Sequence, residues 1–384
     1  MNLESEPSPP VLDPERQRQA GVYARLRRRL FVLELGIGVA YLLAWVFTPL
    51  PVWLRDAIHA RTTLLWLSVP LFALGFAIPY GLLSAPLTWY GGFVLPHRFG
   101  LSTQTFPEWL ADQLKGLLVS GALGLIVLEV VYALLSAAPR TWWLWAAGAM
   151  LLFTVLLSNL APVLIFPLFY KYRPLEDEEL VRRLTRLAER AGAKVRGVYS
   201  FDMSSKTVAA NAAVMGLGNT RRIILGDTLL QHFSHDEIET VLAHELGHHV
   251  HRDILWGVVV QSALTLGGFW LADAVMRWGI AARGLDGLTD PAALPLFLLA
   301  MSLFGLVTMP LGNGWSRWRE SLADRYALQT TRNRTAFIRA MTRLANQNLA
   351  EAQPPRWVEI LLHSHPSIQR RVAMAEQFPL EERG

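Results

Sequence analysis

Residues 234–253, SHDEIETVLAHELGHHVHRD, indicate both the fold and the chemistry of this chain. Ser234 is followed three residues later by Glu237, which is the spacing of a capping box and predicts that a helix begins here. Asp236 adds negative charge to the first turn, where the helix dipole favours it. Apolar residues then recur at helical spacing, so we expect one face of the helix to be buried. That face consists of Ile238, Val241, Leu242 and Leu246.

The same helix carries the pattern HExxH at residues 244–248. His244 and His248 are four residues apart, so both imidazoles leave one helix face and can bind one zinc ion at about 2.0–2.1 Å. Glu245 can reach a water on that metal and take its proton, because the metal lowers the pKa of the water. Histidines on a surface helix give this pattern by chance as well. The capped amphipathic helix around it favours a zinc site.

A catalytic zinc ion needs three protein ligands and one open position. In the pattern HExxHxxGxxH the third histidine would occupy position 254, which is Ile254. The best candidate elsewhere is Glu320, which is again four residues from a second carboxylate, Asp324, on an expected helix. One carboxylate can bind zinc while the other holds the outer nitrogen of a ligand histidine. The alternative is a solvated charged face, since the segment also contains Arg317, Arg319 and Arg325.

An uncharged run begins directly after this helix, and similar runs recur along the chain. Of the 384 residues, 52% are hydrophobic and 17% are charged, whereas soluble domains have about 25% charged residues. Runs of this length can cross a bilayer core of about 30 Å. We expect six spans, or seven if the second run divides. The runs are Leu35–Leu54, Thr62–His97, Gly116–Ala138, Thr141–Tyr170, Ile254–Ala272 and Pro291–Ser316.

The distribution of basic residues predicts the topology. With six spans, both termini and the polar segment around residues 171–253 lie on one side, together with the arginine-rich segment 16–29. Basic residues are enriched on the cytoplasmic side of membrane proteins, so this side should be cytoplasmic. The arginines thus set the topology, and we expect no nucleic-acid partner. The opposite side holds only Arg55, Arg61, Arg140, Arg277 and Arg283.

Two segments outside the spans have the pattern of soluble structure. Pro174–Gly192 carries leucines at helical spacing, with acidic residues first and basic residues later. Three short strands should follow, at Val195–Asp202, Thr207–Met215 and Arg221–Leu225. Trp315–Gly384 should be mainly helical, with a break at residues 353–355. Residues 1–14 have the composition of a disordered tail.

The expected architecture is a mainly α, polytopic membrane protein with a small α+β metalloprotease portion that faces the cytoplasm. Because the chain has no cysteine, it has neither a disulfide scaffold nor a cysteine nucleophile. Only four of the 36 basic residues are lysines, a bias typical of a GC-rich bacterial genome. The expected segments are a basic cytoplasmic tail (1–29), transmembrane helices one to four (30–170), a soluble segment with the HExxH helix (171–253), transmembrane helices five and six (254–316) and a helical C-terminal segment (317–384).

HELGH at 244–248, followed by Glu320-Ser-Leu-Ala-Asp324 after a span, resembles the type I CAAX prenyl endopeptidases, which are integral-membrane zinc metalloproteases of the gluzincin type. YGGFVLPHRFG at 90–100 and PVLIFPLFYKYRPLED at 162–177 are similar to segments of that family. So are Asn211-Ala212 and Ser364-His365-Pro366, the latter with Arg371 six residues after the histidine. The chain resembles bacterial members in particular.

This resemblance implies a role for each matching residue. His244, His248 and Glu320 would bind one catalytic Zn²⁺, with Glu245 as base and acid. Asp324 would hold a ligand histidine from behind, and Asp253 could do the same. Asn211 and Ala212 would contact the substrate backbone from an edge strand. His365 would stabilise the oxyanion, helped or positioned by Arg371; His249 and His251 are expected to be bystanders.

The resemblance also implies a function, namely removal of the C-terminal tripeptide that follows an isoprenylated cysteine. The substrate would be a peptide or protein at the membrane lipid, in a bacterial inner or plasma membrane with the site on the cytoplasmic side. The first alternative is a quality-control metalloprotease for membrane proteins without prenyl specificity. The second is a non-catalytic scaffold or transporter with a structural zinc ion. Glu245 argues against the latter, because a structural site has no use for a base beside the metal.

Overall fold

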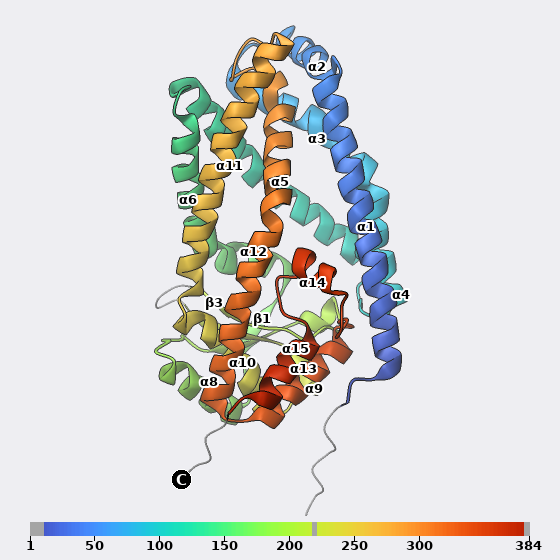
Figure 1. Ribbon diagram of the computed structural model, residues 1–384, viewed down its shortest axis with the longest axis vertical. Coiled ribbons are helices and arrows are strands. Elements are labelled where there is room, and N and C mark those ends of the chain that lie inside the picture. The colour runs from blue at the N-terminus through green and yellow to red at the C-terminus, as the bar shows by residue number, and fades with distance from the viewer. Residues whose placement is uncertain (1–10, 217–220, 380–384) are drawn as a thin grey trace, which may run out of the picture.

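The computed structural model describes residues 11–216 and 221–379, which form a bundle of long helices with a small sheet at one end (Figure 1). In these residues six helices are long and apolar enough to cross a membrane, which confirms the six predicted spans. They are α1 (Pro14–Phe47), α3 with α4 (Leu65–Arg98), α5 (Phe106–Ala137), α6 with α7 (Trp142–Phe169), α11 (Asp253–Arg283) and α12 (Leu294–Thr331).

The uncharged run Thr62–His97 forms one span. Helix α3 (Leu65–Trp89) continues through a π-helical turn, Tyr90–Val94, into α4 (Leu95–Arg98). Three prolines, at positions 70, 79 and 86, lie inside α3, and each removes a backbone hydrogen bond and permits a bend. A second π-helical turn, Ala161–Ile165, joins α6 (Trp142–Leu160) to α7 (Phe166–Phe169). The long runs are therefore bent single spans.

The arginine-rich segment near the N-terminus belongs to the first span. Helix α1 begins at Pro14, where the Asp13 side chain accepts hydrogen bonds from the backbone N–H groups of Glu15 and Arg16. The predicted disordered tail lies, for residues 1–10, outside the described residues. The N-terminal half of α1 contacts the C-terminal part of the chain, since Arg28 forms an ion pair at 2.8 Å with Glu351, which lies between the helices that end at Gln347 and begin at Arg356. Short helix α2 (Leu50–His59) follows at the other end of the bundle (Figure 1).

A four-stranded sheet lies at the end of the bundle that holds the HExxH helix. Its order is β1 (Tyr172–Pro174), β2 (Val198–Phe201), β4 (Arg222–Gly226) and β3 (Ala212–Met215), and β3 is an edge strand antiparallel to β4. Each of the three predicted strands overlaps one of these, and β4 ends one residue beyond the predicted Arg221–Leu225. The unpredicted β1 has only three residues, and its tyrosine and proline give no alternating pattern.

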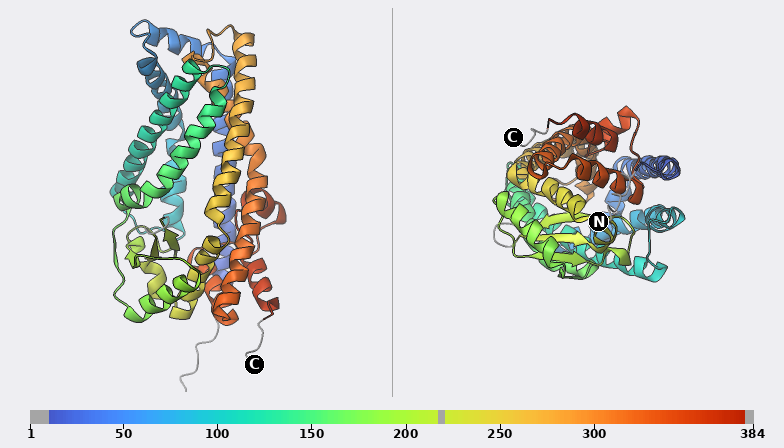
Figure 2. Two further views of the ribbon diagram at one scale, coloured as in Figure 1. Left: turned by 90° about the vertical axis from the view of Figure 1, so that its left-hand side faces the viewer. Right: turned by 90° about the horizontal axis from the view of Figure 1, so that it is seen from below.

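The remaining helices pack around the sheet at the same end, as the view from below shows (Figure 2). Leucines 180, 184 and 187 of α8 (Glu178–Arg190) are buried in the core of this portion, as their spacing predicts. Two helices follow the sheet, α9 (Asp227–His232) and α10 (His235–Val250). Three helices follow α12, namely α13 (Arg334–Gln347), α14 (Arg356–Leu362) and α15 (Ile368–Gln377).

Helices α10 and α12 approach each other closely because a glycine faces an alanine between them. A Cβ atom on Gly247 would lie 2.8 Å from the Cα atom of Ala323, so only glycine fits there without a backbone shift. Helix α12 runs without interruption from the membrane span to Thr331, across the expected boundary at residue 316. A single helix thus connects the spanning part to the HExxH helix.

Candidate active site

The HExxH motif lies on a helix whose start agrees with the sequence prediction. The backbone N–H of Ser234 donates to the Glu237 carboxylate at 2.8 Å, and the Ser234 hydroxyl accepts from the backbone N–H of Glu237 at 3.3 Å. This capping box fixes the first turn of α10. One helical face then presents His244, which is buried, and His248, which is half-buried, toward α12.

Glu320 of α12 meets both histidines. Its carboxylate oxygens lie 3.2 Å from His244 Nε2 and 3.4 Å from His248 Nε2. The ligand atoms of the three residues all lie within 4.8 Å of one another. In a tetrahedral zinc site with bonds of about 2.0–2.1 Å, ligand atoms are separated by about 3.3 Å. The three side chains therefore have the spacing that a zinc ion needs.

One further observation supports a cation at this position. The Glu320 carboxylate is buried, and its Oε2 atom has no hydrogen-bond donor among the described residues. A buried carboxylate without a donor is costly unless a cation or a donor compensates it. Two imidazole nitrogens and a carboxylate are also the ligand set of catalytic zinc sites. The residues present thus fit a divalent metal ion.

A carboxylate holds the outer nitrogen of each histidine. Asp324 accepts from His244 Nδ1 at 2.8 Å, and Asp253 accepts from His248 Nδ1 at 2.7 Å. Because a carboxylate can only accept, these contacts place the proton on Nδ1 and leave the Nε2 lone pairs facing Glu320. Both residues thus lie where the sequence analysis expects partners of the ligand histidines.

An arginine holds each of these carboxylates in turn. Arg371 of α15 donates from Nε to Asp324 at 2.8 Å. Arg319 of α12 donates from Nε to Asp253 at 2.7 Å and from Nη2 to the His251 carbonyl at 2.6 Å. The resemblance implies that Arg371 helps or positions His365. In the structure its guanidinium pairs with Asp324 and lines the cleft that His365 also lines.

Arg319 is the functional candidate that sequence reasoning missed, because it was counted with the charged face. It is buried, with 8% of its surface exposed, and its guanidinium lies over the ring of Trp318. The sequence signal that could have identified Arg319 is its position directly before Glu320. Adjacent helical residues point about 100° apart, so Arg319 reaches the α10–α11 junction while Glu320 reaches the histidines. Arg252, at this junction, has a left-handed backbone with φ of 57°.

A cleft of about 630 Å³ opens beside the candidate metal-binding group. Glu245 lines it, and burial raises the pKa of its carboxylate while the two neighbouring imidazoles lower it. His365 lines the same cleft from the loop between α14 and α15, with Nε2 at 3.3 Å from Glu320. Burial lowers the pKa of His365, which keeps its ring neutral near pH 7. A carboxylate base and a neutral N–H donor thus share one cleft.

Of the other residues considered in the sequence analysis, two line the cleft and two lie near the end of α10. Asn211 and Ala212 line the cleft at the start of the edge strand β3. His251 donates from Nδ1 to the Gly247 carbonyl at 2.8 Å and so caps the end of α10. His249 is half-buried, and neither belongs to the group that could hold a metal in the described residues.

The six spans, the HExxH helix and the glutamate from a second helix define a class, the membrane-embedded metallopeptidases. A family model for peptidase family M48 matches residues 174–378. A second model, described as the CAAX prenyl protease N-terminal region with five membrane helices, matches residues 6–171. The chain belongs to peptidase family M48. In the part of 6–171 that the structure describes there are four candidate spans and the shorter α2.

Individual relatives agree with this assignment. The chain is 30% identical to the uncharacterized metalloprotease YhfN of Bacillus subtilis, over 95% of this chain and 87% of the relative. It is 29% identical to CAAX prenyl protease 1 of Saccharomyces cerevisiae, over 76% of this chain and 68% of the relative. The crystal structure of S. mikatae Ste24p superposes with a TM-score of 0.84 at 25% identity, covering 96% of this chain and 92% of that one. The protein is therefore an integral membrane metalloprotease with a Ste24p-like fold.

Proposed function

We propose that this chain is a zinc endopeptidase that removes the C-terminal tripeptide following an isoprenylated cysteine. The observation that carries the proposal is the group His244, His248 and Glu320 beside Glu245, in a cleft at one end of six membrane-spanning helices. Zinc held by these residues would polarise the scissile carbonyl and lower the pKa of a water molecule. The substrate class follows the names of the relatives, which include several CAAX prenyl proteases.

The residues of the chain have distinct roles in this mechanism. Glu245 takes the proton of the attacking water and gives it to the leaving amide nitrogen. Its raised pKa brings it closer to the operating pH, which favours a base that must also act as an acid. His365 donates from Nε2 to the oxygen on which negative charge develops. Asn211 and Ala212, at the start of the edge strand, bind the peptide backbone.

Two features of the structure support a lipid-modified substrate. The cleft lies where the spans meet the protease portion, so a substrate anchored in the bilayer can reach it. A second cavity of about 490 Å³ lies at the far end of β3, next to Val214 and Met215. Span residues that include Ile165, Phe166 and Ile254 complete this largely apolar cavity, which suits an isoprenyl chain.

We further propose that the cleft faces the cytoplasm of a bacterial cell. The end of the bundle that holds the cleft also holds the arginine-rich start of α1 and the polar segment 171–253, and basic residues favour the cytoplasmic side. The arginine bias and the similarity to the Bacillus subtilis relative support a bacterial source and the inner or plasma membrane.

A second candidate function is a general metalloprotease of membrane-protein quality control. The match to the Bacillus subtilis metalloprotease favours it, because it spans nearly the whole chain and that relative's name specifies no prenylated substrate. The same fold and site serve both candidates, so only substrate preference separates them.

The deciding experiment uses purified protein in detergent with a fluorogenic peptide ending in a farnesylated CAAX sequence and the same peptide without the lipid. We expect the farnesylated peptide alone to be cleaved, whereas cleavage of both identifies a general protease. Glu245→Gln should lower kcat by about 10²–10⁴-fold, the usual contribution of a general base. If the zinc-loaded wild type cuts neither peptide and behaves like Glu245→Gln, the enzyme proposal is wrong.

A further inference from the structure

The cleft beside Glu245 contains one cation, Arg27 of α1, without a partner in the described part of the chain. The other charged side chains of the lining, apart from the proposed base, are paired: Arg371 binds Asp324 at 2.5 Å, and Glu351 binds Arg28 at 2.8 Å. Arg27 is therefore the one cationic side chain of this lining, among the described residues, that no carboxylate neutralises by direct contact, and a bound molecule with a negative group could pair with it.

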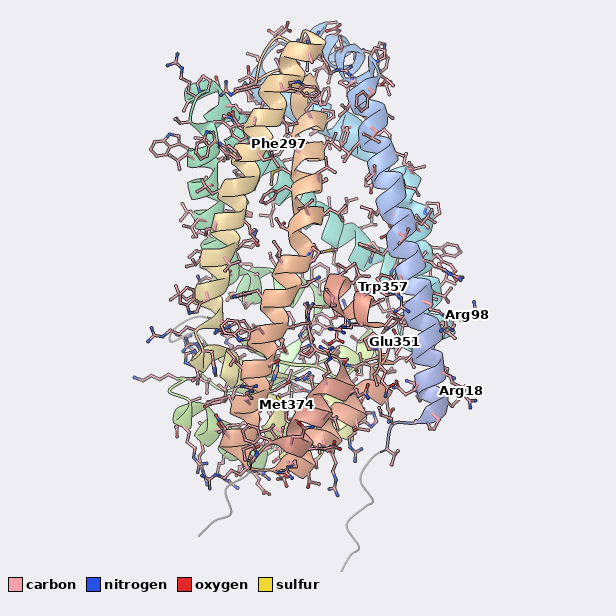
Figure 3. The ribbon with its side chains drawn as sticks, viewed as in Figure 1. Arg18, Arg98, Phe297, Glu351, Trp357 and Met374 are labelled. Atoms are coloured by element: carbon pink, nitrogen blue, oxygen red, sulfur yellow. The ribbon has the colours of Figure 1, made fainter. Side chains whose placement is uncertain are left out.

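Arg27 differs from its arginine neighbours in the direction it faces. Tyr23 and Ala24, one turn earlier on α1, line the same cleft. Arg25 and Arg29 instead line a separate groove along α1, next to Trp357 of α14; Trp357 and Glu351 lie in the space between α1 and α12 (Figure 3). Arg25 and Arg29 can serve the topology alone, whereas Arg27 lines the cleft where the peptide is proposed to bind.

The edge strand sets the direction in which a peptide crosses the cleft. An extended peptide that pairs with β3 adds one strand to the sheet, and antiparallel pairing is the slightly more stable arrangement per residue. Such a peptide runs opposite to β3, so its C-terminal part lies at the start of β3, where Ala210 and Asn211 line the cleft.

The start of β3 is connected to α1 by the segment around residue 348. The Asn348 side chain accepts from the backbone N–H of Ala210 at 2.8 Å and donates to the Ala210 carbonyl at 3.1 Å. The next residue, Leu349, packs against Ala20 of α1. The C-terminal end of an antiparallel peptide therefore points toward the part of α1 that carries Arg27.

We propose that Arg27 binds the free C-terminal carboxylate of the substrate peptide. The inference rests on the proposed function, in which the cut lies three residues before the C-terminus. Three extended residues span about 10 Å, and a cleft of about 630 Å³ has room for a tripeptide. The planar guanidinium of arginine matches a carboxylate with two parallel hydrogen bonds, which an ammonium group cannot provide. Arg27 thus makes the enzyme selective for peptides cut near a free C-terminus.

The test compares two farnesylated fluorogenic peptides that differ only at the end, one with a free carboxylate and one with a carboxamide. Hydrogen bonds to charged groups contribute about 10- to 100-fold in binding, so wild type should cleave the acid with a kcat/KM about 10- to 100-fold higher. In Arg27→Gln this ratio should fall close to one. Arg27→Lys keeps the charge without the bidentate geometry and should give an intermediate ratio.

Arg25→Gln is the matched control, since it removes an arginine of the same helix that lines the separate groove and not the cleft, and it should keep the wild-type ratio. Bound zinc and thermal unfolding of each variant report whether the site and the fold persist. Equal cleavage of the acid and the amide by wild type would overturn the inference, as would an undiminished ratio in both Arg27 variants. Cleavage of neither peptide would refute the proposed function instead.

Discussion

At the scale of single residues, each histidine of the candidate metal site is supported by a carboxylate and, behind it, an arginine. A carboxylate accepts the Nδ1 proton, and an arginine neutralises the carboxylate. This arrangement fixes the tautomer and the ring orientation, so that the two Nε2 atoms face Glu320 before any metal binds. Because the arginines offset the charge of Asp324 and Asp253, the negative charge directed at the metal comes chiefly from Glu320.

Glu320→Ala should therefore remove most of the bound metal. The variant keeps two histidine ligands. Its zinc affinity should fall by more than the 10–100-fold that is typical when a residue that hydrogen-bonds a metal ligand is lost. Chelator competition on detergent-purified protein measures this affinity, and metal analysis measures the content. Glu179→Ala, which removes an exposed carboxylate from α8, is the control. Full zinc content in Glu320→Ala would exclude Glu320 as a ligand.

His365→Ala should separate catalysis from metal binding. Loss of an oxyanion donor lowers kcat by about 10²–10³-fold, while KM and zinc content should change little because His365 is not one of the three candidate ligands. Steady-state kinetics on the farnesylated peptide measure both constants. His249→Ala, which changes a histidine outside the metal-binding group, should behave as wild type. A wild-type kcat in His365→Ala would refute the proposed oxyanion role.

At the scale of elements, the site depends on how α12 packs against α10 and α11. Gly247 lets the two helix backbones approach, so Glu320 reaches both histidines. Arg319 binds the His251 carbonyl at the end of α10 and Asp253 at the start of α11. One arginine therefore holds the turn between two helices and, through Asp253, the orientation of His248.

Arg319→Gln should lower zinc affinity by about 10–100-fold through the loss of this support. In Co²⁺-substituted protein the visible absorption bands should also shift, because the coordination of His248 becomes less well defined. Arg319→Lys should restore part of the affinity, since it keeps a charge near Asp253. Arg325→Gln, an exposed change on the same helix, is the control. A wild-type affinity in Arg319→Gln would show that Asp253 positions His248 without help.

At the scale of the whole molecule, the protein joins two solvent environments. The spans expose apolar side chains such as Leu117, Leu118 and Val307 along their length, as expected for surfaces in contact with lipid. The protease portion has a compact apolar core between α8, the sheet and α10. Helix α12 belongs to both parts, so the position of Glu320 is tied to the membrane-spanning bundle.

The proposed orientation can be tested with thiol labelling, because the chain has no cysteine of its own. Ala60→Cys lies at the α2 end of the bundle, and Arg190→Cys lies on the protease portion; both positions are exposed. A membrane-impermeant maleimide should label Ala60→Cys in intact cells and Arg190→Cys only after lysis. The reverse pattern would place the cleft outside the cytoplasm.

Patterns within one helix were predictable because their physics is local. Hydropathy and length gave the six spans, and the capping box and apolar spacing gave α10. The i, i+4 spacing of His244 and His248 predicted a shared face, on which they do lie. Strand β1 could not be predicted, since a three-residue strand has no period and forms only because β2 is beside it.

Contacts between helices that are far apart in the chain could not be predicted from the sequence pattern. Glu320 and Asp324 could each have been the ligand or the outer partner by spacing, and the packing of α12 on α10 brings Glu320 to Nε2 and Asp324 to Nδ1. Arg319 had the sequence pattern of a solvated charge, yet it is buried against Asp253. Likewise, nothing in the run of arginines distinguishes Arg27, which lines the cleft, from Arg25, which lines a separate groove.

The sequence by itself determined that this is a membrane protein of six spans with a HExxH helix, because hydrophobic length, helical period and capping act over neighbouring residues. Only the tertiary structure decided which histidine nitrogens Glu320 and Asp324 meet, which arginines lie behind the histidines and which residues line the cleft. Those features depend on contacts between helices far apart in the chain, such as the close approach of Gly247 and Ala323. Side-chain direction at such contacts is set by packing, which no local pattern encodes.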